Sequence, residues 1–119
     1  MHIDQLLMPD IRVAAIRRVG PYGPQIGESF TKIFNWACRQ NLCNGSTLGI
    51  GAYYDCPSNT EPAKCRMDAC ITLPEGVNPV LEDGIEIRTL AGGICATCLC
   101  NVYNNDFCAS WDSFSGLLI

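Results

Sequence analysis

The stretch IRVAAIRRVGPYGPQIGESFTKIFNWACRQ, residues 11–40, decides the fold because its hydrophobic period changes partway along. Residues 11–19 have the composition of a β-strand. The sequence GPYGP at 20–24 holds two prolines and two glycines, which predicts a turn. Beyond the turn, apolar residues recur at the spacing of one helical face: Ile26, Phe30, Ile33, Phe34 and Ala37. The stretch therefore predicts a strand, a turn and an amphipathic helix over 25–40, with Trp36 at the edge of its apolar face.

Two further strands are predicted after the helix. In residues 48–54, LGIGAYY, alternation places Tyr53 on the same face as two glycines, which often mark close approach by a ligand or another backbone. Residues 65–73 alternate more clearly, with Met67 and Ile71 facing the core and Asp68 facing outward or toward a second layer. The polar loop between the two runs favours an antiparallel pair.

The C-terminal part of the chain repeats this pattern. Residues 85–90 and 94–102 are strand-like, and a helix is predicted to follow with one apolar face: Phe107, Trp111, Phe114 and Leu118. This self-similarity predicts one α+β domain over 1–119, built from duplicated strand–helix–strand–strand units. Residues 1–74 are the first repeat, and 84–119 are a partial second repeat that lacks its last two strands. We expect a cut-short chain or a partner that supplies these strands, and hence self-association that completes the sheet.

Composition excludes several classes of function. The 119 residues carry 12 acidic and 8 basic side chains, a formal net charge of -4. This balance argues against direct nucleic-acid binding, which needs a clustered basic surface. The apolar runs are too short to cross a membrane, and the first residues do not have the pattern of a signal peptide. A cytoplasmic protein is the expectation.

The nine cysteines are expected to be reduced thiols in a cytoplasmic protein. Cys95 and Cys98 have the CxxC spacing of zinc or redox sites, but they fall in a strand-like run. On a strand, these two side chains point to opposite faces and do not converge on one ion. The chain also has a single histidine, His2. We therefore expect no metal, no cofactor and no cysteine–histidine catalytic pair, with most cysteines filling the core.

Several segments occur in an order that resembles one family. They are VGPYG at 19–23, GAYYDCP at 51–57, PAKCRMDAC at 62–70 and the glycine pair at 92–93. The chain resembles the GyrI-like (gyrase-inhibitor-like) small-molecule-binding family over about residues 3–118. The same domain is the effector-binding part of AraC- and MerR-type multidrug regulators. The resemblance implies a curved antiparallel sheet with two helices on one face, and a ligand groove between the helices and the sheet.

The resemblance also implies a function. It indicates a stand-alone binding module for amphipathic, cationic or planar aromatic small molecules. One alternative is a hydrolase of reactive cyclopropane-type genotoxins, and another is a protein-interaction module that acts on DNA gyrase or on a transcription regulator. In multidrug-binding members, a buried glutamate that pairs with the cation lies in the region of the two missing strands, so no residue here inherits that role. The chain shows no helix-turn-helix pattern, which disfavours direct transcription regulation.

The candidate ligand-binding residues are aromatic side chains and one acid: Tyr22, Trp36, Tyr53, Asp68, Trp111 and Phe114. Aromatic walls stack planar ligands and attract cations through the ring face. The alternative for Trp111 and Phe114 is a helix stripe packed in the core. The alternative for Asp68 is a surface ion pair with Arg66, and Asp55 is expected to cap its loop. No catalytic residue is assigned.

Overall fold

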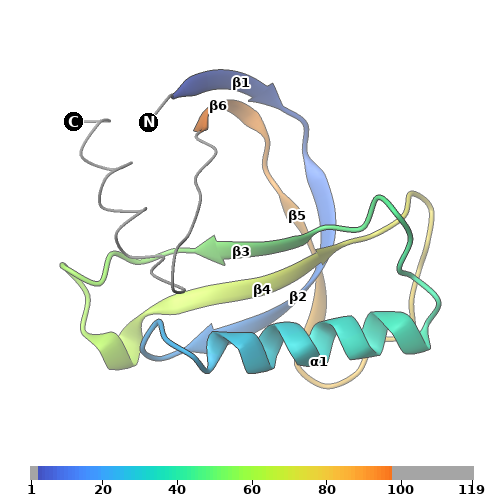
Figure 1. Cartoon of the computed structure of the whole chain (residues 1–119), viewed down its shortest axis with the longest axis horizontal. Coiled ribbons are helices and arrows are strands. Elements are labelled where there is room, and N and C mark those ends of the chain that lie inside the picture. The colour runs from blue at the N-terminus through green and yellow to red at the C-terminus, as the bar shows by residue number, and fades with distance from the viewer. Residues whose placement is uncertain (1–2, 98–119) are drawn as a thin grey trace. The chain divides into compact units, whose positions relative to one another are not determined.

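A computed structural model of the chain describes residues 3–97, which form six strands and one α-helix (Figure 1). The chain divides into two compact units. The larger unit is Ile11–Leu90, and the described parts of the smaller unit are residues 3–10 and 91–97. The α+β class predicted from the sequence is confirmed.

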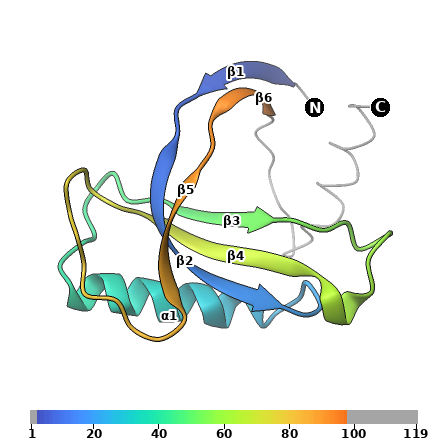
Figure 2. The same cartoon turned by 180° about the vertical axis from the view of Figure 1, so that it is seen from behind.

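The larger unit is a four-stranded antiparallel sheet with a helix along one face (Figures 1 and 2). In chain order its elements are β2 (Ile11–Val19), α1 (Ile26–Arg39), β3 (Gly49–Tyr53), a 3₁₀ turn (Pro62–Lys64), β4 (Arg66–Thr72) and β5 (Ile85–Leu90). The strand order is β3-β4-β2-β5. The predicted antiparallel pairing of β3 with β4 is confirmed, and β2 lies between β4 and β5.

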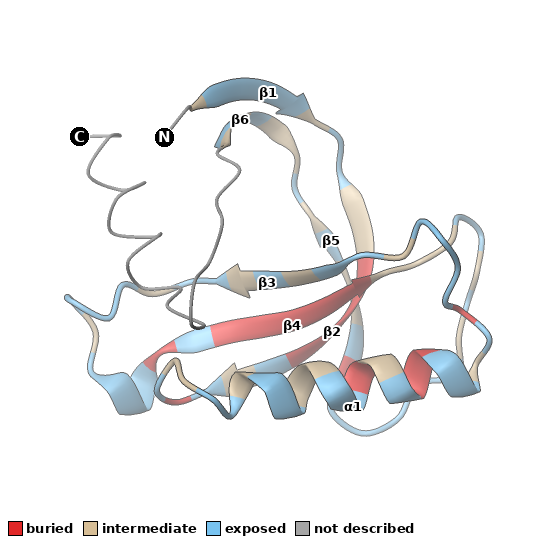
Figure 3. Cartoon of the chain, viewed as in Figure 1, coloured by how far each residue is buried: buried red, intermediate tan, exposed pale blue. Residues whose placement is uncertain are grey.

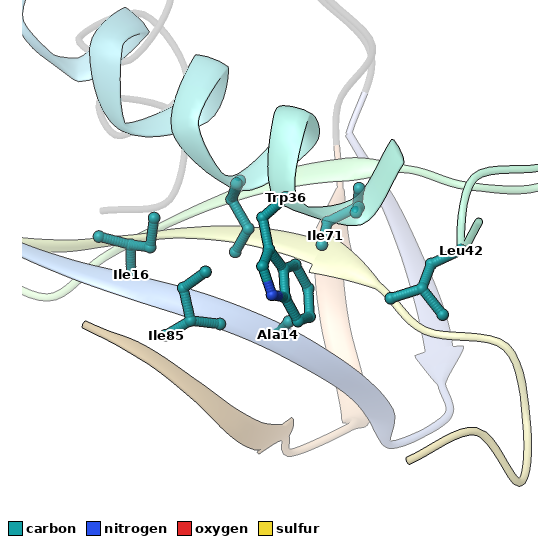
Figure 4. Packing of buried hydrophobic residues seen from close by; sticks show 8 residues of the cluster. Ala14, Ile16, Trp36, Leu42, Ile71 and Ile85 are labelled. Carbon is teal, nitrogen blue, oxygen red and sulfur yellow. The ribbon is translucent and has the colours of Figure 1, made fainter. Parts of the chain in front are cut away.

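The main core lies between α1 and the sheet. Ile33, Trp36 and Ala37 of the helix are fully buried and belong to one cluster with Ala14 of β2 and Ile71 of β4 (Figure 4). The predicted place of Trp36 at the edge of the apolar face is wrong, because its exposed fraction is 0%. Its indole Nε1 donates a hydrogen bond to the carbonyl of Val80 at 3.0 Å, which satisfies the one polar group that this side chain buries.

The opposite face of the sheet is also buried in its centre. Val13 and Ala15 of β2 and Cys70 of β4 form a second cluster, against which Ile50 and Ala52 of β3 pack. Successive residues of a strand point to opposite faces, so this cluster cannot share a face with Ala14 and Ile71. The residues of β4 from Met67 to Ile71 are therefore all buried (Figure 3). The prediction that Asp68 faces outward is wrong, because its exposed fraction is 0%.

The smaller unit is a two-stranded ribbon in its described part. β1 (Asp4–Met8) pairs antiparallel with β6 (Gly93–Thr97). At its end the Gly92 N–H donates to the Asp10 side chain at 2.7 Å. A Cβ at Gly92 would come 2.1 Å from the Met8 carbonyl oxygen, so this position requires glycine. The strand at residues 4–8 was not predicted, because its short apolar run carries little periodicity.

The predicted second repeat falls mostly outside the described residues. This holds for the helix carrying Trp111 and Phe114, and for Cys98 of the CxxC pair. The duplicated units, the second helix and the self-association stay predictions. Within residues 3–97, α1 is too short and too polar to span a bilayer.

Candidate functional site

A buried carboxylate lies on the sheet face opposite α1. Asp68 of β4 is 0% exposed, and Arg17 of β2 is its direct cross-strand partner. Arg17 donates from Nε to one carboxylate oxygen and from Nη2 to the other. The Tyr54 hydroxyl donates to Oδ2 at 2.7 Å, and Arg88 Nε of β5 lies 3.4 Å from the same oxygen. We call Arg17, Tyr54, Asp68 and Arg88 the polar cluster.

The electrostatics of the polar cluster keep Asp68 ionised. Burial raises the pKa of this carboxyl group, but the hydrogen bonds from Arg17 and Tyr54 outweigh burial, so the pKa lies below its ordinary value. The hydrogen bond to Asp68 raises the pKa of Arg17 and also that of Tyr54. The Arg17 guanidinium also lies 4.8 Å from the centre of the Tyr54 ring, a cation–π contact. Asp68 is therefore a charge already matched by the protein's own cations.

The alternative interpretation of Asp68, a surface ion pair with Arg66, is wrong. Residues two apart on a strand share a face, but their Cα atoms lie about 7 Å apart, while a cross-strand neighbour is nearer. Arg66 instead pairs with Asp55, to which its Nε and Nη2 donate at 3.0 Å each. The backbone N–H of Arg66 donates to the same carboxylate at 2.7 Å, so Asp55 does cap its loop. These hydrogen bonds hold the pKa of Asp55 below its ordinary value.

Two of the candidate aromatic residues form a ring pair. The Tyr22 and Tyr53 rings lie with their centroids 5.0 Å apart at 82°, an edge-to-face contact. The Tyr22 hydroxyl donates to the Arg66 carbonyl oxygen and accepts from the Asp55 N–H, which fixes this ring against the loop after β3. Tyr53 is 41% exposed. Desolvation raises the pKa of both tyrosines, so both remain protonated at neutral pH.

The glycines of β3 do mark close approach, but the rings that approach belong to the protein. A Cβ at Gly49 would lie 3.1 Å from the Phe34 ring of α1. A Cβ at Gly51 would lie 2.9 Å from the Tyr53 ring. Aromatic rings of the protein therefore lie beside both glycines, and Tyr53 itself is partly exposed.

The structure separates the six candidate residues. It brings Tyr22 and Tyr53 together, and it places Asp68 in the polar cluster. It buries Trp36 in the core under α1, where a ligand could reach it only if the core opened. Trp111 and Phe114 lie outside the described residues.

Three partners of Asp68 were not predicted from the sequence: Arg17, Tyr54 and Arg88. The signal was present for Arg17, which shares its strand face with the apolar Val13 and Ala15. A charged residue on the same strand face as buried apolar residues predicts that an opposite charge is buried next to it. No comparable sequence signal linked Arg88 to Asp68, because the pairing of β5 with β2 was not predicted.

The described residues also enclose a small hollow. It has a volume of about 70 Å³ and is lined by Asn44, Ser46, Thr47, Thr72, Leu73 and Pro74. Sites for drug-sized ligands measure roughly 300–1,000 Å³, so this hollow has room for water rather than for a bulky guest. Within residues 3–97, no cluster of three or more metal-ligating side chains is found.

Comparison with known proteins gives consistent matches over the chain. The family described as the GyrI-like small molecule binding domain matches residues 1–118. A DNA gyrase inhibitor of Pectobacterium carotovorum is 35% identical over 115 residues, covering 96% of this chain and 73% of that protein. DNA gyrase inhibitor 2 of Dickeya dadantii is 32% identical over 112 residues, covering 92% and 69%. A DNA gyrase inhibitor of Salmonella typhimurium is 26% identical over 108 residues, covering 90% and 68%.

Proposed function

Because the chain belongs to the family of GyrI-like small molecule binding domains, we propose that it binds planar, amphipathic aromatic molecules, with Tyr53 as a stacking contact. The observation that carries this proposal is the exposed Tyr53 ring, held edge-to-face by a hydrogen-bonded Tyr22. A ring fixed by a neighbour loses little conformational freedom when a flat ligand stacks on it. Trp111 and Phe114 remain proposed as further aromatic contacts.

We propose that ring stacking contributes more to this binding than ligand charge does. Asp55 and Asp68 are both paired with arginines, so neither offers an uncompensated carboxylate to a cation. A positive ligand gains from the tyrosine ring faces, at roughly 0.5–2 kcal/mol per contact, and from the overall charge of -4. Cationic planar molecules are therefore the preferred class, followed by neutral planar ones, while compact cations without a flat surface bind least.

A dye titration tests the stacking contact. We expect a planar cationic dye, followed by fluorescence anisotropy, to bind saturably. Tyr53→Ala is expected to weaken it by roughly ten-fold, since an aromatic stacking contact contributes about 1 kcal/mol beyond area, while Tyr53→Phe keeps most of the affinity. Leu48→Ala is the matched control, because Leu48 is a 60% exposed apolar residue just before the same strand. Equal affinity of Tyr53→Ala and the unmodified chain would contradict the proposal.

A second candidate function rests on the relatives, three of which carry the name DNA gyrase inhibitor or DNA gyrase inhibitor 2. We propose that this chain also acts on DNA gyrase. A supercoiling assay with purified gyrase and relaxed plasmid tests it, with the expected result that supercoiling falls as the chain is added. Unchanged supercoiling at concentrations that saturate dye binding would remove this candidate and leave small-molecule binding standing.

The hydrolase alternative needs a carboxylate that activates water, and Asp68 suits that role poorly. Its pKa is lowered and it accepts hydrogen bonds from Arg17 and Tyr54, so its affinity for a proton is low. General bases work best with a pKa near the working pH. Turnover of an electrophilic cyclopropane substrate that is lost in Asp68→Asn would restore the alternative.

A further inference from the structure

Two exposed cysteines lie side by side at the end of α1. Cys38 is in the last turn of the helix and Cys43 is in the loop that comes after it, and both are free thiols. Their sulfur atoms are 3.6 Å apart. Neither residue belongs to the polar cluster or to the tyrosine pair, so the chemistry of these two thiols is independent of the proposed small-molecule binding.

The backbone holds this pair in place. Asn41 has a φ of 57°, the left-handed conformation that ends many helices, and its N–H donates to the Cys38 carbonyl. The N–H of Leu42 donates to the Ala37 carbonyl. The Leu42 side chain is 6% exposed and belongs to the same core cluster as Trp36. The turn between the cysteines is therefore anchored in the core, and Cys43 returns next to Cys38 without any covalent link.

We propose that Cys38 and Cys43 form a reversible disulfide when the chain meets a small disulfide oxidant such as oxidised glutathione. A disulfide needs its sulfurs about 2.05 Å apart, and side-chain rotation at two exposed positions can close the remaining gap of roughly 1.5 Å. The anchored turn keeps the second thiol next to the first at high effective concentration.

The chemistry balances in two exchange steps. The thiolate of one cysteine attacks a sulfur of oxidised glutathione, which forms a mixed disulfide and releases one glutathione thiolate. The second cysteine, deprotonated, then attacks the protein-side sulfur, which closes the Cys38–Cys43 bond and releases the second glutathione. The two protein thiols lose two protons and two electrons, and one oxidised glutathione is reduced to two thiols.

The other cysteines of residues 3–97 offer useful contrasts. Cys65 and Cys70 are buried, and desolvation raises the pKa of Cys70 to about 11, which keeps it a protonated, unreactive thiol. Cys56 is exposed in the loop after β3, so it reports how an accessible thiol reacts elsewhere on the same surface. Desolvation and the neighbouring Cys38 thiol raise the pKa of Cys43, so disulfide closure is expected to accelerate by up to ten-fold per pH unit above neutrality.

Peptide mapping tests the proposal on the full chain. The chain is incubated with oxidised glutathione, its remaining thiols are alkylated, and it is digested with trypsin. Trypsin cuts after Arg39, so the disulfide joins peptide 33–39, which holds Cys38, to peptide 40–64, which holds Cys43 and Cys56. We expect this joined pair, 2 Da lighter than the sum of its parts, and its loss after treatment with dithiothreitol.

Single substitutions assign the bond. Cys56→Ser, the matched control, is expected to keep the joined pair, while Cys43→Ser loses it and leaves Cys38 as a glutathione mixed disulfide. Cys38→Ser gives the mirror result, so the assignment does not depend on one variant folding. Full alkylation of both Cys38 and Cys43 after exposure to oxidised glutathione overturns the proposal, as does a joined pair that persists in Cys43→Ser.

Discussion

The two faces of the four-stranded sheet are buried by different kinds of contact. The face under α1 is closed by apolar packing around Trp36, with one hydrogen bond from the indole to a carbonyl. The opposite face combines a small apolar patch around Val13 and Cys70 with an ionised Asp68 held by Arg17 and Tyr54. The first face is stabilised by apolar side chains that fill the space under the helix. The second face is stable only when the buried charge makes all of its hydrogen bonds.

This difference has a consequence for function. A packed apolar face resists change anywhere along it, so its aromatic residue Trp36 is a structural element. Outside both clusters, a few directed hydrogen bonds join Tyr22, Asp55 and Arg66. The exposed Tyr53 ring rests edge-to-face against the Tyr22 ring. Tyr53 shares its strand face with Gly49 and Gly51, the face toward α1, so the proposed ligand contact depends on the hydrogen bonds that hold Tyr22 rather than on the polar cluster.

The largest effect is expected for Trp36→Ala. The change removes the largest fully buried side chain of residues 3–97 and its hydrogen bond to Val80, which lowers the free energy of unfolding by about 3–5 kcal/mol. Urea denaturation followed by circular dichroism measures it. Val80→Ala is the control, because that side chain is 74% exposed while its carbonyl stays in place. A loss below about 1 kcal/mol would show that the helix face is not the principal core.

Asp68→Asn is expected to have the next largest effect. It removes the charge that matches Arg17 and Arg88, at a cost of about 2–3 kcal/mol, less than for a fully buried pair because Arg17 is partly exposed. The folded pKa of Asp68 is lowered, so its stabilisation is present above the unfolded pKa and is lost as pH falls through the folded pKa. Unfolding free energies measured from pH 7 to pH 2 should therefore depend less on pH in the variant; identical slopes would contradict the prediction.

Tyr54→Phe isolates one hydrogen bond of the polar cluster. The ring stays under the Arg17 guanidinium, but the 2.7 Å bond from the hydroxyl to Asp68 is lost. We expect a loss of about 1–2 kcal/mol in the free energy of unfolding, because the acceptor is charged. A double-mutant cycle with Asp68→Asn measures the coupling. If the two losses simply add, Tyr54 does not act through Asp68.

Gly51→Ala gives the smallest expected change in stability. The added Cβ would lie 2.9 Å from the Tyr53 ring, but that ring is partly exposed and can swing outward. The free energy of unfolding should change by less than about 1 kcal/mol, while dye affinity falls because the ring loses its contact with Tyr22. Gly45→Ala is the control, since nothing lies within 4 Å of a Cβ there. Unchanged dye affinity in Gly51→Ala would show that the contact between Tyr22 and Tyr53 does not contribute to dye binding.

The elements of strong periodicity were predictable from the sequence. The strand at 11–19 agrees with the structure at both ends, and the helix begins and ends within one residue of the prediction. The alternation of β4 placed Asp68 on the correct face. Periodicity could not tell that Asp68 is buried on this face, because a strand buried on both sides and a strand buried on one side can share the same alternation. The predicted position of Trp36 was wrong for a related reason. A bulky side chain next to the apolar face of a helix can rotate toward the core and become fully buried.

The sequence by itself determined the class of the fold, the main strands and helix, and the alternation of side chains along β4. Local physics suffices for these, because turn residues and hydrophobic period act over a few neighbouring positions. Only the tertiary structure decided that Asp68 pairs with Arg17, that Tyr22 meets Tyr53, and that Cys43 returns to Cys38. Those contacts depend on strand order, register and the turn after the helix, and no local pattern in one strand specifies which neighbour it will have.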